Sequence, residues 1–471
     1  MSEGENFTDG FIEQKSWKKS VFYFFLSLII ALALTFILKE SSFTQSQVYV
    51  LFLLFFALLL WITEAIPPFA VSLFILAYLV YTLGNPNLNS APEKIDPYVN
   101  TFSSSVIWLL LGGFFMASAL KKTGLDKKLL ALTLRMSGTR PQNILAASMF
   151  TTWISAMLIS DSAATSMVVA SLMPLLISIG KSGTSKALLL GVAIAAALGG
   201  MGTVIANVTN ATAVGLLEKE GIKVSFLEWM YYGIPVSLIL LLISWYALSK
   251  AFIKKAERIS LEFLNVEPPK NLAGIKGQRT IVLIVIIVTI LFWLTGSVHG
   301  IPVATIAAIP IVVLTATRIL SAADIKALPW DALFLITGGL SLGTALQNTG
   351  LLDHYANYLK AMTIQPVFFI LILSYIAMLF ANVSSGLACI MLFVPLGMAV
   401  LPDYKAEVSI SIGLSVTTTV LLPISIPSNV IVYGTGLLEQ KDFRLGGIIV
   451  GLLGPLLAVL WTLFLRNLLV H

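Results

Sequence analysis

Long apolar segments alternate with short polar ones along almost the whole chain. A helix rises about 1.5 Å per residue, so segments of this length predict helices that cross a bilayer. The alternating pattern of a transmembrane β-barrel is not seen. Such helices are predicted near 20–38, 48–65, 69–83, 105–120, 187–216 and 226–249, with further ones in the second half of the chain.

Composition agrees with this pattern. Of the 471 residues, 58% are hydrophobic and 11% are charged, whereas a soluble domain carries roughly 25% charged residues. The mean hydropathy is +0.94. We therefore predict an all-α polytopic membrane protein with about 11 transmembrane helices.

Two apolar stretches are interrupted by small polar residues. The sequence Ser-Asp-Ser at 160–162 divides the stretch 143–180 into arms of about 17 residues, which are short for a full span. The sequence Asn-Val-Ser-Ser-Gly at 382–386 divides the stretch 365–401. Non-helical backbone at membrane depth is tolerated only where protein or a water-filled cavity surrounds it. We therefore predict two re-entrant helical hairpins, 143–180 and 365–401.

Two other helices are predicted to be broken. The first contains Gly-Gly-Met-Gly-Thr at 199–203, followed by Asn207 and Asn210. Close helix packing is one explanation for these glycines. The second contains Pro423 and Pro427, which cannot continue a regular helix and leave carbonyl oxygens free. Interrupted helices at matching places in two halves are typical of the central site of a transporter.

Distant parts of the sequence repeat each other. Residues 108–125 and 334–351 share Gly-Gly, Ala-Leu and Thr-Gly-Leu at a constant offset of 226, and Ser160 and Ser384 lie 224 residues apart. Self-similarity at long period indicates two copies of one unit. We predict inverted repeats of about 100–226 and 327–471. The predicted regions are N-terminal scaffold helices 1–99, a first repeat 100–249, a cytoplasmic linker 250–279 and a second repeat 280–471.

Charge predicts the orientation. Residues 121–141 hold six cations against one acid among leucines, which indicates an amphipathic interfacial helix on the cytoplasmic side. The net charge of +6 therefore reflects loop orientation, and nucleic acid is not expected as a partner. We predict an integral protein of the inner or plasma membrane, in contact with lipid, with a cytoplasmic N-terminus and an external C-terminus. The first hairpin then enters from the cytoplasm and the second from outside.

The first hairpin break contains the candidate chemistry. Asp161 is ionisable and lies within a hydrophobic segment, which marks an ion or substrate pathway. Capping of the following helix is an equally simple role for Ser160 and Asp161. A helix N-terminus at the membrane centre also presents a positive dipole end to an anion. Hydroxyl and carbonyl oxygens near the break suit a small cation.

Other classes of function fit less well, and we expect no enzyme. An aspartyl protease needs paired aspartates, and the second hairpin has none to match Asp161. A serine hydrolase needs a base near its serine, and none is seen at these depths. A channel would not need two broken helices with inverted hairpins. The single Cys389 excludes an intramolecular disulfide, and the three dispersed histidines argue against a histidine metal cluster.

Several motifs together carry a resemblance to a known family. Over nearly its whole length the chain resembles the divalent anion:sodium symporter family, the dicarboxylate/sodium transporters. The resemblance implies a homodimer with a scaffold domain and a mobile transport domain that moves as an elevator. It also implies a Ser-Asn-Thr motif at each hairpin tip that binds substrate carboxylate and sodium. The motifs are Trp-Ile-Thr-Glu-Ala-Ile-Pro at 61–67, Gly-Gly-Phe at 112–114 through Gly124 and Leu125, residues 199–203 with Asn210, 226–235, and 423–434.

The chain departs from the family pattern at four places. Asp161 stands where the first tip has Asn, and residues 384–386 lack the Asn of the second tip. Ile426 replaces a usual Thr, and residues 206–209 replace a Gly-Thr/Ser-Pro-Pro run. Because the family motif is incomplete here, the candidate ligands are the residues that this chain itself has at the tips and breaks. Those for substrate are Asp161, Ser162, Ser384, Ser385, Gly386 and Pro423, and those for sodium are Ser160, Asp161, the carbonyl region of Gly199, Ser384, Thr418 and Pro423.

The main hypothesis is a secondary active transporter of a small organic anion, a di- or tricarboxylate, coupled to sodium. One alternative keeps the fold and replaces sodium by protons, with Asp161 as the proton carrier, or by exchange of substrates. Another alternative keeps the fold and replaces the organic substrate by an inorganic divalent anion such as sulfate.

Overall fold

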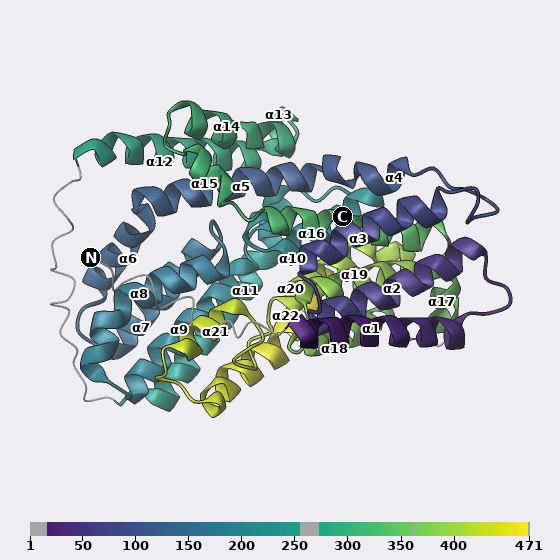
Figure 1. Ribbon diagram of the computed structural model, residues 1–471. Helices are drawn as coiled ribbons and strands as arrows, with labels where there is room; N and C mark the ends of the chain where they lie inside the picture. The colour runs from purple at the N-terminus through teal and green to yellow at the C-terminus, as the bar shows by residue number, and fades with distance from the viewer. Residues whose placement is uncertain (1–16, 255–272, 362–363, 470–471) are drawn as a thin grey trace.

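The computed structural model describes residues 17–254, 273–361 and 364–469, and regular structure in these ranges is helical throughout (Figure 1). The all-α prediction is confirmed. Among the described residues, nine helices have the length and apolar composition needed to cross a bilayer, and four further apolar helices are shorter. The count of about 11 spans stays a prediction. Most of the predicted linker 250–279 lies outside the described residues.

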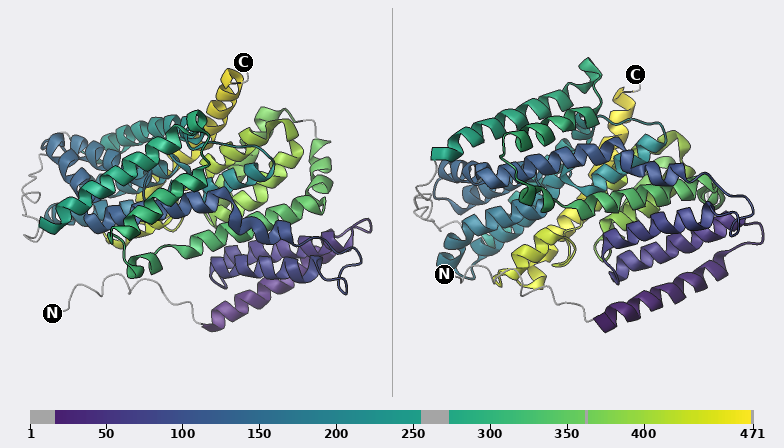
Figure 2. Two further views of the ribbon diagram at one scale, coloured as in Figure 1. Left: turned by 90° about the horizontal axis from the view of Figure 1, so that it is seen from above. Right: turned by 45° about the horizontal axis from the view of Figure 1, so that its top comes forward.

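Seven helices form a row, each packed on the next in the order α1, α2, α3, α16, α5, α14 and α12. Figures 1 and 2 show α12 and α14 along one edge of the molecule and α1 along the opposite edge. The helices of this row are α1 (Trp17–Leu38), α2 (Gln45–Thr63), α3 (Pro68–Leu83), α5 (Ser105–Thr123), α12 (Ala273–Leu294), α14 (Val303–Ala316) and α16 (Trp330–Asn348).

A second group of helices, the hairpin bundle, contains the two hairpins and the helices packed with them. The two predicted hairpins are present, as α7 with α8 and as α18 with α19. In Figure 1 α21 lies beside α7, α8 and α9, and the packing of α21 on α8 and α9 agrees. The bundle contains α7 (Pro141–Ala156), α8 (Asp161–Ile179), α9 (Gly183–Gly200), α10 (Val208–Lys219), α11 (Phe226–Phe252), α18 (Pro366–Ala381), α19 (Gly386–Val400), α20 (Lys405–Val416), α21 (Pro427–Gly434) and α22 (Phe443–Leu469).

The echo in the sequence corresponds to equivalent structure. Gly124 and Gly350 end α5 and α16 in the left-handed region, with φ of 64° and 71°. Glycine adopts this conformation without the steric penalty of a Cβ. Each is followed by a short amphipathic helix, α6 (Leu125–Ser137) or α17 (Leu351–Lys360). A Cβ at Gly112 would lie 2.9 Å from Ala307 Cβ, and one at Gly338 would lie 2.3 Å from Ser72 Cβ, so both helices need glycine for close packing.

The two hairpins open toward opposite ends of the molecule. Glu220 follows α10 directly and bonds Lys405, the first residue of α20, at 2.5 Å. The end of α10 and the start of α20 therefore lie at the same end of the molecule. The second hairpin opens at this end, because α19 finishes just before α20 begins. The first hairpin finishes just before α9 begins, at the other end. This is the arrangement that the predicted inverted repeats require.

Candidate functional site

The first hairpin turns over residues 157–160, and polar groups gather where α8 begins. Ser160 is the N-cap of α8, and its Oγ accepts a hydrogen bond from Ala163 N at 3.3 Å. The carboxylate of Asp161 accepts from Ser162 N at 2.6 Å. The hydroxyls of Ser160 and Ser162 lie 3.2 Å apart. Capping thus accounts for Ser160, whereas the carboxylate of Asp161 forms no ion pair within the described part of the chain.

The second hairpin tip carries serines with weaker bonds. Ser385 is the N-cap of α19, but its side chain makes no capping hydrogen bond. Ser384 Oγ lies 3.5 Å from Ser385 O and 3.8 Å from Cys389 Sγ. A Cβ at Gly386 would lie 2.9 Å from Val416 Cγ1 and 3.3 Å from Thr209 Cγ2. This tip therefore packs against both broken helices, and the hydroxyls of its serines remain able to bind a ligand.

Both predicted helix breaks are present, and an asparagine bridges each of them. The first break covers residues 201–207 between α9 and α10, and Asn210 Nδ2 donates to Gly200 O at 2.7 Å and Thr203 O at 2.9 Å. The second break covers 417–426 between α20 and α21, and begins earlier than the predicted 423–429. There Asn429 Nδ2 donates to Val420 O at 3.2 Å and Leu422 O at 2.8 Å.

Each hairpin tip is joined to the helix break of its own half. Thr203 Oγ1 donates to Met157 O at 2.7 Å in the first half. In the second half, Asn382 Oδ1 accepts from Leu421 N at 3.2 Å and from Ser425 Oγ at 3.0 Å. The contact of the second tip with Thr209 means that both tips touch the segment from 201 to 209. The tips and the breaks therefore form one connected site.

Several buried oxygen atoms at this site have no hydrogen-bond partner among the described residues. Buried polar groups are normally satisfied, so such atoms indicate a ligand position or a bridging water. Thr209 and Asn210 lie in the first turn of α10, and Ser428 lies at the corresponding place in α21, one residue before Asn429. The unpartnered atoms are Thr209 Oγ1, Asn210 Oδ1, Ser428 Oγ and, in α8, Thr165 Oγ1.

Most of the predicted ligands lie at the two hairpin tips. Ser160, Asp161 and Ser162 lie together at the start of α8, and Ser384, Ser385 and Gly386 lie together at the start of α19. Pro423 is buried within the second break, between the two residues that bond Asn382.

Two predicted sodium ligands have other structural roles. A Cβ at Gly199 would lie 2.3 Å from Trp153 O, so α9 packs closely on α7 at this residue. The Thr418 hydroxyl donates to Ser415 O at 2.6 Å, and its methyl group lies 2.5 Å from a Cβ placed at Gly454 in α22. Thr418 is therefore directed toward α22.

The sequence interpretation missed Asn382, Thr209 and Ser428. A signal was available, because Thr209-Asn210 and Ser428-Asn429 repeat a hydroxyl followed by Asn at an offset of 219. The offset between residues 108–125 and 334–351 is 226. It differs here because the segment that follows this first motif is shorter in the second half of the chain than in the first.

Comparison with known proteins gives a consistent result along the whole described chain. A family model described as the sodium:sulfate symporter transmembrane region matches residues 18–471. The sodium-dependent dicarboxylate transporter SdcS of Staphylococcus saprophyticus is 25% identical over 467 residues, which covers 91% of this chain and 88% of that protein.

Two yeast proteins share somewhat higher identity over a shorter region. The inorganic phosphate transporter PHO87 of Saccharomyces cerevisiae is 31% identical over 309 residues, 64% of this chain and 33% of that protein. An uncharacterized transporter of Schizosaccharomyces pombe is 31% identical over 304 residues, 63% of this chain and 34% of that protein. The match thus spans about a third of the length of each yeast relative.

Solved structures share the fold. The Alcanivorax borkumensis YdaH transporter superposes with a TM-score of 0.57 at 15% identity, covering 85% of this chain and 98% of that one. Neisseria gonorrhoeae MtrF superposes with a TM-score of 0.55 at 13% identity, covering 84% of this chain and 94% of that one. At these identities the similarity concerns the fold alone.

Proposed function

The chain belongs to the sodium:sulfate symporter family, and we propose that it carries a small dicarboxylate across the membrane together with sodium ions. The observation that carries this proposal is the connected site of two hairpin tips and two helix breaks, in which several buried oxygen atoms have no partner within the described ranges. The name of SdcS, a sodium-dependent dicarboxylate transporter, supports the choice of substrate and ion.

The anion would be bound mainly by helix ends. The half-helices α8, α10, α19 and α21 all begin at the connected site, and each N-terminus offers free N–H groups and a positive dipole end. The hydroxyls of Ser162, Ser384 and Ser385 would add neutral donors to the carboxylates. No Lys or Arg lies in residues 157–163 or 382–388, so side-chain cations of the tips contribute nothing to binding.

Sodium would supply the missing positive charge. Burying a dianion without counter-charge is unfavourable in a low-dielectric site. The unpartnered oxygen atoms of Thr209, Asn210 and Ser428 are hard ligands of the kind that small cations prefer. The Asp161 carboxylate is a further candidate at the first tip. Because anion and cation would stabilise each other in one site, transport of one is coupled to transport of the other.

The movement that we propose is a displacement of the hairpin bundle against the helix row, with alternating exposure of the site to the two sides. Both hairpins and both helix breaks belong to the bundle, so the bundle would carry the whole site with it. The row would remain fixed and provide the contact between two copies in a homodimer. We propose an N-terminus on the cytoplasmic side, from the cation distribution.

An inorganic oxyanion is the second candidate substrate, because the relative PHO87 is an inorganic phosphate transporter with 31% identity. Helix N-termini and hydroxyl donors bind phosphate or sulfate as readily as carboxylate. A proton is the alternative coupling ion, with Asp161 as its carrier.

Competition experiments in proteoliposomes test the substrate assignment. Uptake of labelled succinate would be measured under an inward sodium gradient, with unlabelled malate, citrate, sulfate or phosphate in excess. We expect malate to compete strongly and the inorganic anions to compete weakly. Labelled phosphate or sulfate taken up in preference to succinate would replace the dicarboxylate by the inorganic anion.

A further inference from the structure

Three consecutive charged residues at the end of α10 reach from the hairpin bundle to the helix row. The carboxylate of Glu218 accepts hydrogen bonds at the start of α5, from Ser105 Oγ at 2.5 Å and from Ser104 Oγ at 3.3 Å. Lys219 donates to the hydroxyl of Thr344 in α16. Glu220 accepts from Gln347 Nε2, also in α16, at 2.5 Å. The end of one half-helix is thus attached to the two central helices of the row.

These contacts explain an arrangement that α10 alone would disfavour. The C-terminus of a helix is its negative end, so carboxylates at Glu218 and Glu220 are unfavourable there. Glu218 instead faces Ser104 and Ser105, the N-cap and first residue of α5. The N-terminus of a helix is its positive end and stabilises an anion. The charge of Glu218 is therefore complementary to α5, on the other side of the boundary between bundle and row.

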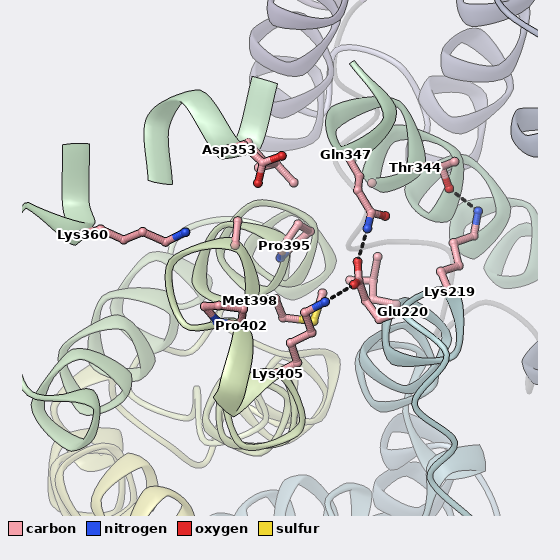
Figure 3. A pocket seen from close by; sticks show the side chains of 14 residues that line it. Lys219, Glu220, Thr344, Gln347, Asp353, Lys360, Pro395, Met398, Pro402 and Lys405 are labelled. Atoms are coloured by element: carbon pink, nitrogen blue, oxygen red, sulfur yellow. Dashed lines mark hydrogen bonds and ion pairs between the residues drawn. The ribbon is translucent and has the colours of Figure 1, made fainter. Parts of the chain in front are cut away.

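The contacts to α16 line a cavity of about 180 Å³ at this boundary. Figure 3 shows the Glu220 carboxylate between the Gln347 amide and the Lys405 ammonium, and the Lys219 ammonium next to the Thr344 hydroxyl. The side chain of Glu220 is 11% exposed, and Lys405 lies 2.5 Å from it. Side chains do not pack against each other across a cavity. Polar bonds therefore contribute a larger share of the attraction between the bundle and the row at this place.

We propose that Glu218, Lys219 and Glu220 form a polar lock that holds the hairpin bundle against the row in one state of the transport cycle. The inference rests on the proposed movement of the bundle. The bonds to α5 and α16 would break together when α10 leaves these helices. The Glu218 carboxylate would then be hydrated at the end of the helix, whereas Glu220 would keep its ion pair with Lys405 inside the bundle. The lock therefore sets how often the state shown here is populated, without contacting substrate or sodium.

Crosslinking tests the lock without any measurement of transport. A Cβ at Gly343 in α16 would lie 2.8 Å from Leu216 Cδ2 in α10, so cysteines at these positions report the closed boundary. Leu216→Cys and Gly343→Cys would be combined in a Cys389→Ala background and treated with a short bifunctional thiol reagent. Glu218→Gln, Lys219→Met and Glu220→Gln would be added singly and together. Each single change is expected to slow crosslinking about threefold, because each weakens a hydrogen bond of a charged group across the boundary.

The control is Lys223→Met, because Lys223 is an exposed lysine four residues after Lys219. It should crosslink at the unaltered rate, and Lys219→Arg should retain most of the wild-type rate. Size-exclusion chromatography of each variant distinguishes unfolding from opening of the boundary. If the triple variant does not fold, the single variants alone test the lock. Unchanged crosslinking in all three single variants would overturn the lock. If the wild-type protein takes up no dicarboxylate but the three single variants still crosslink more slowly, the proposed substrate is wrong and the lock is retained.

Discussion

Asn210 and Asn429 make the same bridging contact in two halves of the chain. Each donates its carboxamide N–H groups to a carbonyl seven residues earlier and to a second carbonyl slightly further back, Gly200 O for Asn210 and Val420 O for Asn429. Both side chains are fully or almost fully buried. The two asparagines therefore replace helix hydrogen bonds that the breaks have removed, which non-helical backbone at membrane depth requires.

Replacement of either asparagine by leucine should open its break. Asn210→Leu or Asn429→Leu leaves two buried carbonyl oxygens without a donor, at about 1–3 kcal/mol for each unsatisfied group. We expect a lower melting temperature and at least tenfold slower uptake. The control is Asn357→Leu in α17, where the asparagine is exposed. Wild-type stability in both Asn210→Leu and Asn429→Leu would show that the bridges are dispensable.

Adjacent glycines at the end of α9 should respond differently to alanine. A Cβ at Gly199 would lie 2.3 Å from Trp153 O, so Gly199→Ala must push α9 away from α7, at about 1–3 kcal/mol. At Gly200 the nearest atom would be Asn207 Nδ2, at 3.7 Å. Gly200→Ala should therefore leave stability unchanged or slightly raised. Thermal unfolding of the detergent-solubilised proteins measures both, and equal stability of the two variants would contradict the close packing of α7 and α9.

Much of this fold was predictable because membrane helices leave a strong signal in sequence. Apolar length predicted the spans, and small polar residues predicted breaks at 160–162 and 382–386. The structure has these turns at 157–160 and 382–385, because α8 already begins at Asp161. Proline predicted the second break, but its start was predicted too late, since residues 417–422 contain no helix-breaking residue. Beyond the end of α20 at Val416, Asn382 and Asn429 supply hydrogen bonds to Leu421 N and Val420 O in place of those of a continued helix.

The site was predicted less completely than the fold, for a physical reason. Residue type identified Ser160, Asp161 and Ser384 at the tips. Whether a hydroxyl is free depends on its neighbours in space. Thr418 donates to Ser415 O in the last turn of α20, whereas Thr209 Oγ1 has no partner among the described residues. Sequence spacing does not contain that information.

Serines at the tips should be required for transport. Ser162→Leu and Ser384→Leu each remove a donor and fill space at the start of a half-helix, so we expect uptake to fall at least a hundredfold while the protein stays folded. Ser178→Leu is the control for the first tip, because Ser178 is exposed at the other end of α8. Folding is checked by size-exclusion chromatography. Normal uptake by either tip variant would remove that tip from the site.

Asp161→Asn separates the possible roles of the carboxylate. If Asp161 helps to bind sodium, the amide oxygen still coordinates, so transport continues with sodium affinity weakened by about 1 kcal/mol, or roughly fivefold. We expect this result from sodium-dependence curves of uptake. Uptake that becomes independent of pH, and that never needed sodium, would identify a proton carrier instead. Unchanged sodium and pH dependence would leave Asp161 with the structural role of accepting the Ser162 N–H in the first turn of α8, which an Asn oxygen also fills.

The proposed orientation can be tested by labelling single cysteines in a Cys389→Ala background. Met136 in α6 is 78% exposed, and Lys223 is exposed after α10. Met136→Cys should react with a membrane-impermeant reagent only after the membrane is opened, and Lys223→Cys should react in intact cells. The opposite pattern would invert the proposed topology.

Sodium-driven accumulation tests directly whether the protein couples dicarboxylate transport to sodium. Labelled succinate would be added to proteoliposomes that contain the purified protein, with an inward sodium gradient and without a proton gradient. We expect transient accumulation above the external concentration, which disappears when an ionophore dissipates the sodium gradient. Accumulation that persists without sodium, or that requires a proton gradient or internal counter-substrate, would contradict sodium symport.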